Sequence, residues 1–248
     1  MNTSDMNAPF LEIRDLNVQF GAITALQSVH LVINESETIG LIGSNGAGKT
    51  TLTKCVVGAL PTEKGSILID GRPVAFSGPG AARLAGIECV FQTQALVDDL
   101  SVVQNIFLGR EICGAFGSIN TRAMRSEAKA LFARLGIPED LLDRELRYCS
   151  GGERQIVALS KAFYFQARLL FLDEPLTALS IQKKHVVLEL LQKLKDDHRS
   201  TIVMISHDLA ETYALCDRFL IMNRGTIVRD VLKSAISYAE LEQFMRGI

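Results

Sequence analysis

Hydrophobic and polar residues alternate over two stretches near the N-terminus of the chain. The apolar positions are Leu11, Ile13, Leu16, Val18 and Phe20 in the first stretch and Val29, Leu31 and Ile33 in the second. Period-two alternation is typical of strands that bury one face. Further strands are predicted at 66–71, which runs into an Asp-Gly turn, and at 73–76. We interpret these segments as an antiparallel β-layer around the buried apolar strand 39–42.

The pattern becomes helical from about residue 94, after another predicted strand at 87–91. Apolar residues recur every three to four positions over 121–135 and 153–165. Strands and helices alternate again after residue 166. The predicted elements there are strands at 169–172 and 201–205, helices around 187–194 and at 209–215, a hairpin of 219–222 with 226–228, and a tail helix at 234–245.

These elements predict an α/β fold with a parallel sheet, an N-terminal antiparallel β-layer and an inserted helical lobe. Residues 1–93 and 167–248 are expected to form the core, and residues 94–166 the helical lobe. The whole chain is expected to form a single nucleotide-binding domain.

The composition is that of an ordinary globular protein, with 48% apolar and 22% charged residues in 248. The net charge is −2, and no run of Lys or Arg indicates a nucleic-acid surface. The five cysteines are scattered and lack C-x-x-C spacing, which favours reduced thiols in the cytosol. The N-terminus has no signal-peptide pattern, and no apolar stretch approaches the ~18 residues of a membrane helix. We therefore expect a cytoplasmic chain, and any transport pore must belong to another chain.

The strongest motif follows the strand 39–42 and matches G-x-x-x-x-G-K-[ST]. Its residues are Gly43, Ser44, Asn45, Gly46, Ala47, Gly48, Lys49, Thr50 and Thr51. The glycines let backbone N–H groups approach phosphate oxygens, Lys49 reaches the β- and γ-phosphates, and Thr50 offers a hydroxyl to Mg²⁺. A helix predicted at 51–60 directs its positive end at the same phosphates. The motif predicts a site for ATP or GTP with Mg²⁺.

A second motif ends the apolar strand 169–172 in two carboxylates. Asp173 is placed to hold Mg²⁺ beside the phosphate loop. Glu174 points to the other side of the strand and can accept a proton from an attacking water. Two surface acids at a strand end are the alternative, and the upstream phosphate loop favours the catalytic interpretation.

A third segment, Ser150–Glu153, precedes the helix predicted at 153–165. Ser150 is a plausible N-cap, and the two glycines leave room for an anion at the helix N-terminus. Taken alone, this segment is better explained as an ordinary cap and loop.

Together these motifs resemble the ATP-binding subunits of ABC transporters over nearly the whole chain. The matching residues are the phosphate loop 43–51, the signature segment Ser150, Gly151, Gly152 and Glu153, the Walker B strand with Asp173 and Glu174, the Q-loop residue Gln92, and the switch residue His207. The resemblance implies that His207 reaches the γ-phosphate and that Gln92 senses Mg²⁺ and the membrane partner. It also implies that Phe20 stacks on adenine.

The same resemblance implies a head-to-tail dimer, in which the signature segment of one subunit closes on ATP held by the phosphate loop of the other. It further implies Mg²⁺ ligation by Thr50, Gln92 and Asp173, with Glu174 and His207 as the catalytic pair. The expected partners are membrane-spanning permease subunits at the inner face of the cell membrane, a second ATPase subunit and, indirectly, a solute-binding protein.

Three positions depart from the family pattern. Cys149 replaces the usual leucine of the signature motif, and Glu153 stands where glutamine is usual. Ser180 replaces the aspartate that ends the family's D-loop, and it cannot carry that charge in coupling the two ATP sites.

Ser180 and the segment 105–111 are similar to ATPases of monosaccharide importers of the ribose, galactose and fructose type. Most of those ATPases are two fused copies, whereas this chain is one. The alternatives are an importer of branched-chain amino acids or other small solutes, a soluble ABC ATPase of translation or DNA repair, and a P-loop kinase. The soluble ABC ATPases normally carry paired cassettes, and a kinase would not explain Ser150–Gly152 or His207.

Overall fold

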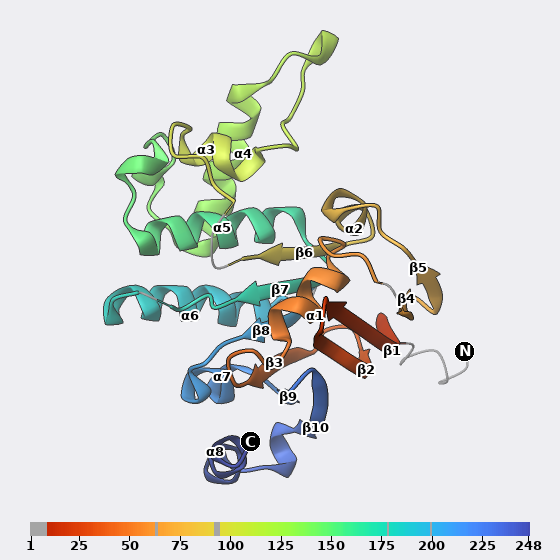
Figure 1. The fold of residues 1–248 in the computed structure, drawn as a ribbon. Helices are drawn as coiled ribbons and strands as arrows, with labels where there is room; N and C mark the ends of the chain where they lie inside the picture. The colour runs from red at the N-terminus through yellow and green to blue at the C-terminus, as the bar shows by residue number, and fades with distance from the viewer. Residues whose placement is uncertain (1–8, 63, 92–94, 178, 199) are drawn as a thin grey trace, which may run out of the picture.

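The structure is a computed structural model that describes residues 9–62, 64–91, 95–177, 179–198 and 200–248. Its centre is a six-stranded sheet of order β10-β9-β3-β8-β7-β6 (Figure 1). The strands are β3 (Thr38–Gly43), β6 (Ile87–Val90), β7 (Leu169–Asp173), β8 (Thr201–Ile205), β9 (Arg218–Asn223) and β10 (Thr226–Leu232). The pairs from β9 to β6 are parallel, and β10 is antiparallel to β9. Strands β3, β7 and β8 are apolar almost throughout because helices and the second sheet cover both faces.

The second sheet is antiparallel, with the order β2-β1-β4-β5. Its strands are β1 (Leu11–Phe20), β2 (Ile23–Ile33), β4 (Lys64–Ile69) and β5 (Arg72–Val74). The prediction of an antiparallel layer is confirmed. The strand 39–42 itself belongs to the other sheet, where β3 pairs with β8 and β9. The layer packs over β3 through a shared hydrophobic core with α1 (Lys49–Val56).

Three helices between β6 and β7 lie together on one side of the parallel sheet (Figure 1). They are α3 (Val102–Phe107), α4 (Thr121–Leu135) and α5 (Gly151–Phe165). Their buried side chains continue without a break into those of β7, β8 and α6 (Ile181–Asp196). This continuous core holds α5, and therefore the signature segment at its start, at a fixed position relative to the sheet. The division into a core and a helical lobe stays a prediction.

The remaining elements are α2 (Pro79–Leu84), α7 (Leu209–Leu215), α8 (Tyr238–Arg246) and four short 3₁₀ helices at 115–117, 139–141, 146–148 and 233–235. The strands at 169–173 and 201–205 and the helices at 121–135 and 209–215 agree with the sequence prediction. The predicted tail helix begins too early, because a 3₁₀ turn occupies 233–235 and Ser237 caps α8. The predicted helix 51–60 begins earlier and ends at Val56.

No helix in the described part of the chain is long and apolar enough to cross a membrane.

Candidate nucleotide-binding site

The phosphate loop connects the central strand β3 to α1. Gly48 precedes α1 with φ of 103°, a left-handed conformation that favours glycine. A Cβ at Gly48 would also lie 2.8 Å from the Ala25 carbonyl oxygen and 2.9 Å from Leu26 Cδ2. A Cβ at Gly43 would overlap the Met222 carbonyl group. The glycines therefore let β2 and β9 pack directly against the loop, which fixes where its backbone N–H groups point.

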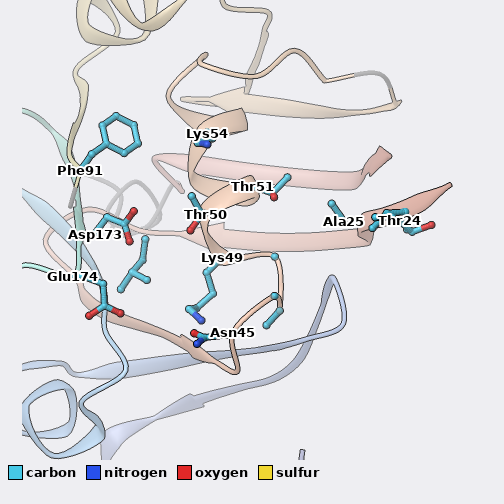
Figure 2. A pocket seen from close by; sticks show the side chains of 15 residues that line it. Thr24, Ala25, Asn45, Lys49, Thr50, Thr51, Lys54, Phe91, Asp173 and Glu174 are labelled. Carbon is cyan, nitrogen blue, oxygen red and sulfur yellow. The ribbon is translucent and has the colours of Figure 1, made fainter. Parts of the chain in front are cut away.

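A cavity of about 500 Å³ opens over this loop and the first turns of α1 (Figure 2). Its lining comes from β2, the phosphate loop, α1, the end of β6 and the carboxyl ends of β7 and β8. The lining residues are Ile23, Thr24, Ala25, Asn45, Gly46, Ala47, Gly48, Lys49, Thr50, Thr51, Lys54, Phe91, Asp173, Glu174 and Ile205. In Figure 2, Asp173 and Glu174 lie to the left of α1, and Thr24 and Ala25 to its right. Most of the predicted phosphate-loop residues are thus brought together with both predicted carboxylates.

Lys49 lies at the base of this cavity. Its Nζ donates to the carbonyl oxygens of Gly43 at 2.7 Å and Ser44 at 3.0 Å. Burial lowers the pKa of Lys49, while the charges of Glu174 and Asp173 act in the opposite direction. The amine is therefore a desolvated cation held by backbone dipoles beside two carboxylates, a setting in which it can pair strongly with an entering phosphate.

The two carboxylates reach the cavity through the register of the parallel sheet. Asp173, the last residue of β7, is paired with Ile205 of β8, and the Glu174 N–H donates to the Ile205 carbonyl at 2.9 Å. The prediction that Glu174 points away from Asp173 by strand alternation is wrong: Glu174 has φ of 54°, outside the strand region, and both carboxylates line the same cavity. Burial, and then the charge of Glu174, raise the pKa of Asp173. Two close, partly buried carboxylates beside the Thr50 hydroxyl form a donor set that fits a divalent cation.

His207 lies against Glu174 on the side away from β7. Its Nδ1 is 2.7 Å from Glu174 Oε2, and the same oxygen accepts from Thr177 Oγ1 at 2.7 Å. The Glu174 side chain is 16% exposed, whereas the His207 side chain is 69% exposed. The Glu174 carboxylate is therefore held from two sides, while the imidazole extends outward from it.

We expect Asp173→Asn to raise the Tm of the nucleotide-free protein at pH 7, because it removes a partly buried charge beside Glu174. The pKa of Asp173 is raised on folding, so the ionised folded protein carries a cost that appears above pH ~3.8 and is absent below it. The rise in Tm at pH 7 should therefore disappear near pH 3.5. Asp143→Asn is the matched control, because Arg125 lowers the pKa of Asp143 and its loss should not raise Tm. Equal rises in both variants would contradict this reasoning.

The signature segment forms the N-terminus of α5, away from the cavity lining. The prediction that Ser150 caps this helix is confirmed: its Oγ accepts from the Glu153 N–H at 3.4 Å. Glu153 Oε2 accepts from the Ser150 N–H at 2.7 Å and completes a capping box. Glu153 Oε1 also accepts from Arg144 at 3.1 Å. Gly151 is exposed with open space where its Cβ would be, whereas Gly152 is buried under the Lys183 side chain.

Several predicted site residues that the structure describes lie outside the cavity lining, namely Phe20, Gly43, Ser44, His207 and the signature segment 150–153. Phe20 ends β1 and is 49% exposed, and the neighbouring lining is supplied by Ile23, Thr24 and Ala25 instead. Gln92 lies outside the described residues. The assigned roles of all these residues stay predictions.

The sequence interpretation missed several lining residues. Lys54 lies four residues after Thr50 on α1, so helical spacing could have identified it. Thr24, Ala25 and Ile205 reach the site only through the packing of β2 and β8, and no local pattern marks them. Thr177, which donates to Glu174, was likewise missed.

The fold and the phosphate-loop cavity define an ATP-binding cassette. A nucleotide-free ATP-binding cassette from an ABC transporter superposes with a TM-score of 0.80 at 21% identity, covering 96% of this chain and 95% of that one. CbiO1 from Clostridium perfringens, part of the CbiONQ ABC transporter complex, gives a TM-score of 0.79 at 26% identity, covering 96% of this chain and 94% of that one. The predicted fold class is thereby confirmed.

The chain belongs to the ABC transporter family, whose pattern matches residues 26–177. The xylose/arabinose import ATP-binding protein XylG of Sulfolobus acidocaldarius is 37% identical over 95% of this chain and 93% of its own length. The ribose import ATP-binding protein RbsA 1 of Streptomyces coelicolor is 40% identical over 97% of this chain, which spans 47% of that protein. The resemblance stated from the motifs is confirmed.

Proposed function

We propose that this chain binds and hydrolyses ATP to energise an ABC importer of a monosaccharide. The observation that carries the proposal is the placement of Lys49, Thr50 and the carboxylates of Asp173 and Glu174 around one cavity of about 500 Å³. Family membership and the sugar-import names of the similar proteins support the choice of an importer and of its solute class.

In this proposal the phosphate loop and Lys49 hold the β- and γ-phosphates. Thr50, Asp173 and Gln92 would hold Mg²⁺, which would supply positive charge beside the phosphates. Glu174 accepts the proton of the attacking water. Its carboxylate is positioned by Thr177 and His207, each 2.7 Å away, so little reorganisation is needed when water enters. His207 contacts the γ-phosphate from the solvent-exposed side of the Glu174–His207 pair.

The signature segment supports the second part of the proposal, which is that the protein acts as a dimer. It lies at the start of α5 and contributes nothing to the cavity lining of its own chain. A dimer in which α5 of one copy faces the phosphate loop of the other gives this segment a ligand. We propose this head-to-tail homodimer, in keeping with the dimeric cassette structures that share the fold.

The proposed partners are membrane-spanning permease subunits and, through them, a solute-binding protein, with the chain at the cytoplasmic face of the membrane. An importer of branched-chain amino acids or another small solute is the second candidate, because the phosphate loop is the same in both. The names of the similar proteins favour the sugar importer.

Co-expression with candidate sugar-permease subunits tests the proposal. The complex should co-purify, and vesicles containing it should accumulate labelled D-xylose or D-ribose with ATP inside and a solute-binding protein outside. Accumulation of labelled leucine in place of either sugar would favour the second candidate. Full ATPase activity without any membrane partner that co-purifies would contradict a transport role.

We place the permease contact on residues 92–108, of which the structure describes 95–108. Val97 is 41% exposed there, and buried Asn105 fixes its backbone by accepting from the Val97 N–H at 2.7 Å and donating to its carbonyl at 3.0 Å. Val97→Glu should reduce sugar uptake at least tenfold and leave the ATPase activity of the isolated chain unchanged, because it alters only the outer surface. Val228→Glu, at a side chain 44% exposed on β10, is the control. Equal uptake by both variants would place the contact elsewhere.

A further inference from the structure

The His207 side chain depends on the backbone that carries it for its position. It is 69% exposed, and its ring contacts Glu174 Oε2 through Nδ1 at 2.7 Å. The backbone of His207 lies between the end of β8 and the start of α7, a helix of only 7 residues. Isolated helices of this length are unstable in water, so contacts with the rest of the protein must hold α7 in place.

Asp208, directly after His207, caps α7. Its Oδ1 accepts from the Glu211 N–H at 3.1 Å, and its own N–H donates to Ser206 Oγ at 3.0 Å. Thr212 Oγ1 donates to the Asp208 carbonyl at 2.7 Å. The peptide units on both sides of Asp208 are therefore fixed by hydrogen bonds, and a shift of this cap would move His207 with it.

Lys184 reaches this cap from the first turn of α6. Its Nζ donates to Glu211 Oε1 at 2.7 Å and lies 3.8 Å from Asp208 Oδ2. Within the described residues, the second carboxylate oxygen of Glu211 is buried and has no hydrogen-bond partner. Lys184 therefore supplies the charge that compensates this partly buried carboxylate. The hydrogen bond with Glu211 raises the pKa of Lys184, so the ammonium group stays charged at neutral pH.

The helix that carries Lys184 is a firm support for this contact. A second lysine of α6, Lys195, holds the other end of α7, where its Nζ donates to the Leu215 carbonyl at 2.7 Å and to Asp217 Oδ1 at 2.6 Å. The two lysines thus anchor α7 at opposite ends, and the end held by Lys184 adjoins His207. The side chains that bury α6 in the core are Val187, Leu190, Leu191 and Leu194.

We propose that Lys184 is a positioning residue for ATP hydrolysis that holds the His207 imidazole against Glu174. It acts through the cap of α7, by its contacts with Asp208 and Glu211. The inference rests on the proposed ATPase function, and it adds a residue that belongs to none of the motifs matched in the sequence. Lys184 is absent from the cavity lining. Its removal should therefore displace the imidazole while the phosphate loop keeps its shape.

The test compares single-turnover ATP hydrolysis by the full chain with its ATP affinity, which calorimetry measures separately. Lys184→Met should lower the rate of hydrolysis about tenfold, because a small misplacement of an aligned group is costly to the rate. ATP affinity should change less than about twofold, since the groups that bind the phosphates are untouched. Lys184→Arg should recover most of the rate, because it keeps both the charge and the reach to Glu211.

Lys195→Met is the matched control. Each variant removes one lysine of α6 that anchors α7, so both should lower Tm. Lys195→Met should nevertheless keep the parent rate of hydrolysis, because it releases the end of α7 that is farther from His207. An equal loss of rate in both variants would mean that Lys184 only stabilises the fold, and would overturn its positioning role.

Two further measurements connect the effect to His207. In a His207→Ala background, adding Lys184→Met should not lower the residual rate further, because both changes act through the same imidazole. In NMR spectra of the nucleotide-free chain, the assigned ring signals of His207 should shift in Lys184→Met, as they should when Glu174→Gln alters the partner of the ring. The same signals should stay unchanged in Lys195→Met.

The outcomes separate this inference from the proposed function. A parent that hydrolyses ATP while Lys184→Met keeps the full rate overturns the role of Lys184 alone. Additive losses from Lys184→Met and His207→Ala also overturn it. A parent without any ATPase activity contradicts the proposed function, and the role of Lys184 in hydrolysis falls with it. Unchanged His207 ring signals in Lys184→Met refute the contact-mediated positioning whatever the activity of the parent.

Discussion

Lys49→Ala should reduce ATP hydrolysis at least a thousandfold and weaken ATP binding strongly. The Lys49 ammonium is half-buried, and within the described part of the chain its hydrogen bonds go to the loop carbonyls of Gly43 and Ser44, so it can turn to the β- and γ-phosphates. Removing it leaves the phosphate charge facing Asp173 and Glu174 without compensation. Phosphate release and calorimetric ATP affinity measure the two effects.

Lys64→Ala is the control for this prediction, because Lys64 lies on β4 with a side chain 72% exposed and forms an exposed ion pair with Asp15 at 3.6 Å. The control should retain the parent activity, since exposed pairs contribute little. Near-normal turnover by Lys49→Ala would overturn the assignment of the phosphate site.

Local motifs in the sequence were sufficient for the phosphate loop and the strand that ends in Asp173. Each of these sites is built from consecutive residues, so spacing determines the geometry. The pairing of strands was harder, because the register of β3 with β8 and β9 joins residues more than a hundred positions apart. For this reason the antiparallel layer was predicted, but its separation from the sheet that contains β3 was not.

Short helices were difficult to predict from the sequence for a different reason. The helix α3 has only six residues, too few for a 3.6-residue period to be recognised, although the capping box of Ser101 and Gln104 marks its start. The same signal, Ser237 with Glu240, marks the true beginning of α8 and would have corrected the tail helix. Capping residues therefore locate the starts of α3 and α8 better than apolar periodicity does.

Side-chain contacts between motifs could not be obtained from their spacing. Glu174 and His207 were assigned separate roles, and the structure adds a direct contact between them. Lys183 carried no sequence signal at all, because its contact with Ser150 depends on how α5 and α6 pack.

Glu174→Gln should lower ATP hydrolysis by about 10²–10⁴-fold while leaving ATP bound, because the amide cannot accept the proton of the attacking water. The phosphate loop and Asp173 are unchanged, and Gln at this position keeps an oxygen that can accept from Thr177, so the cavity should retain its shape. Single-turnover phosphate release and nucleotide retention after gel filtration measure the two effects. Glu189→Gln, on the exposed face of α6, should behave like the parent.

The Glu174→Gln variant also tests whether the protein forms a dimer when ATP is bound. If the signature segment of one copy closes on ATP held by another, Glu174→Gln should run as a dimer with ATP–Mg²⁺ and as a monomer with ADP, in gel filtration or light scattering. Adding Ser150→Arg should abolish the dimer, because the larger side chain fills the space in front of α5, whose N-terminus Ser150 caps. A Glu174→Gln protein that stays monomeric at high concentration with ATP–Mg²⁺, both alone and with its membrane partner, would refute the dimer, because ATP that is bound but not cleaved should hold the two copies together.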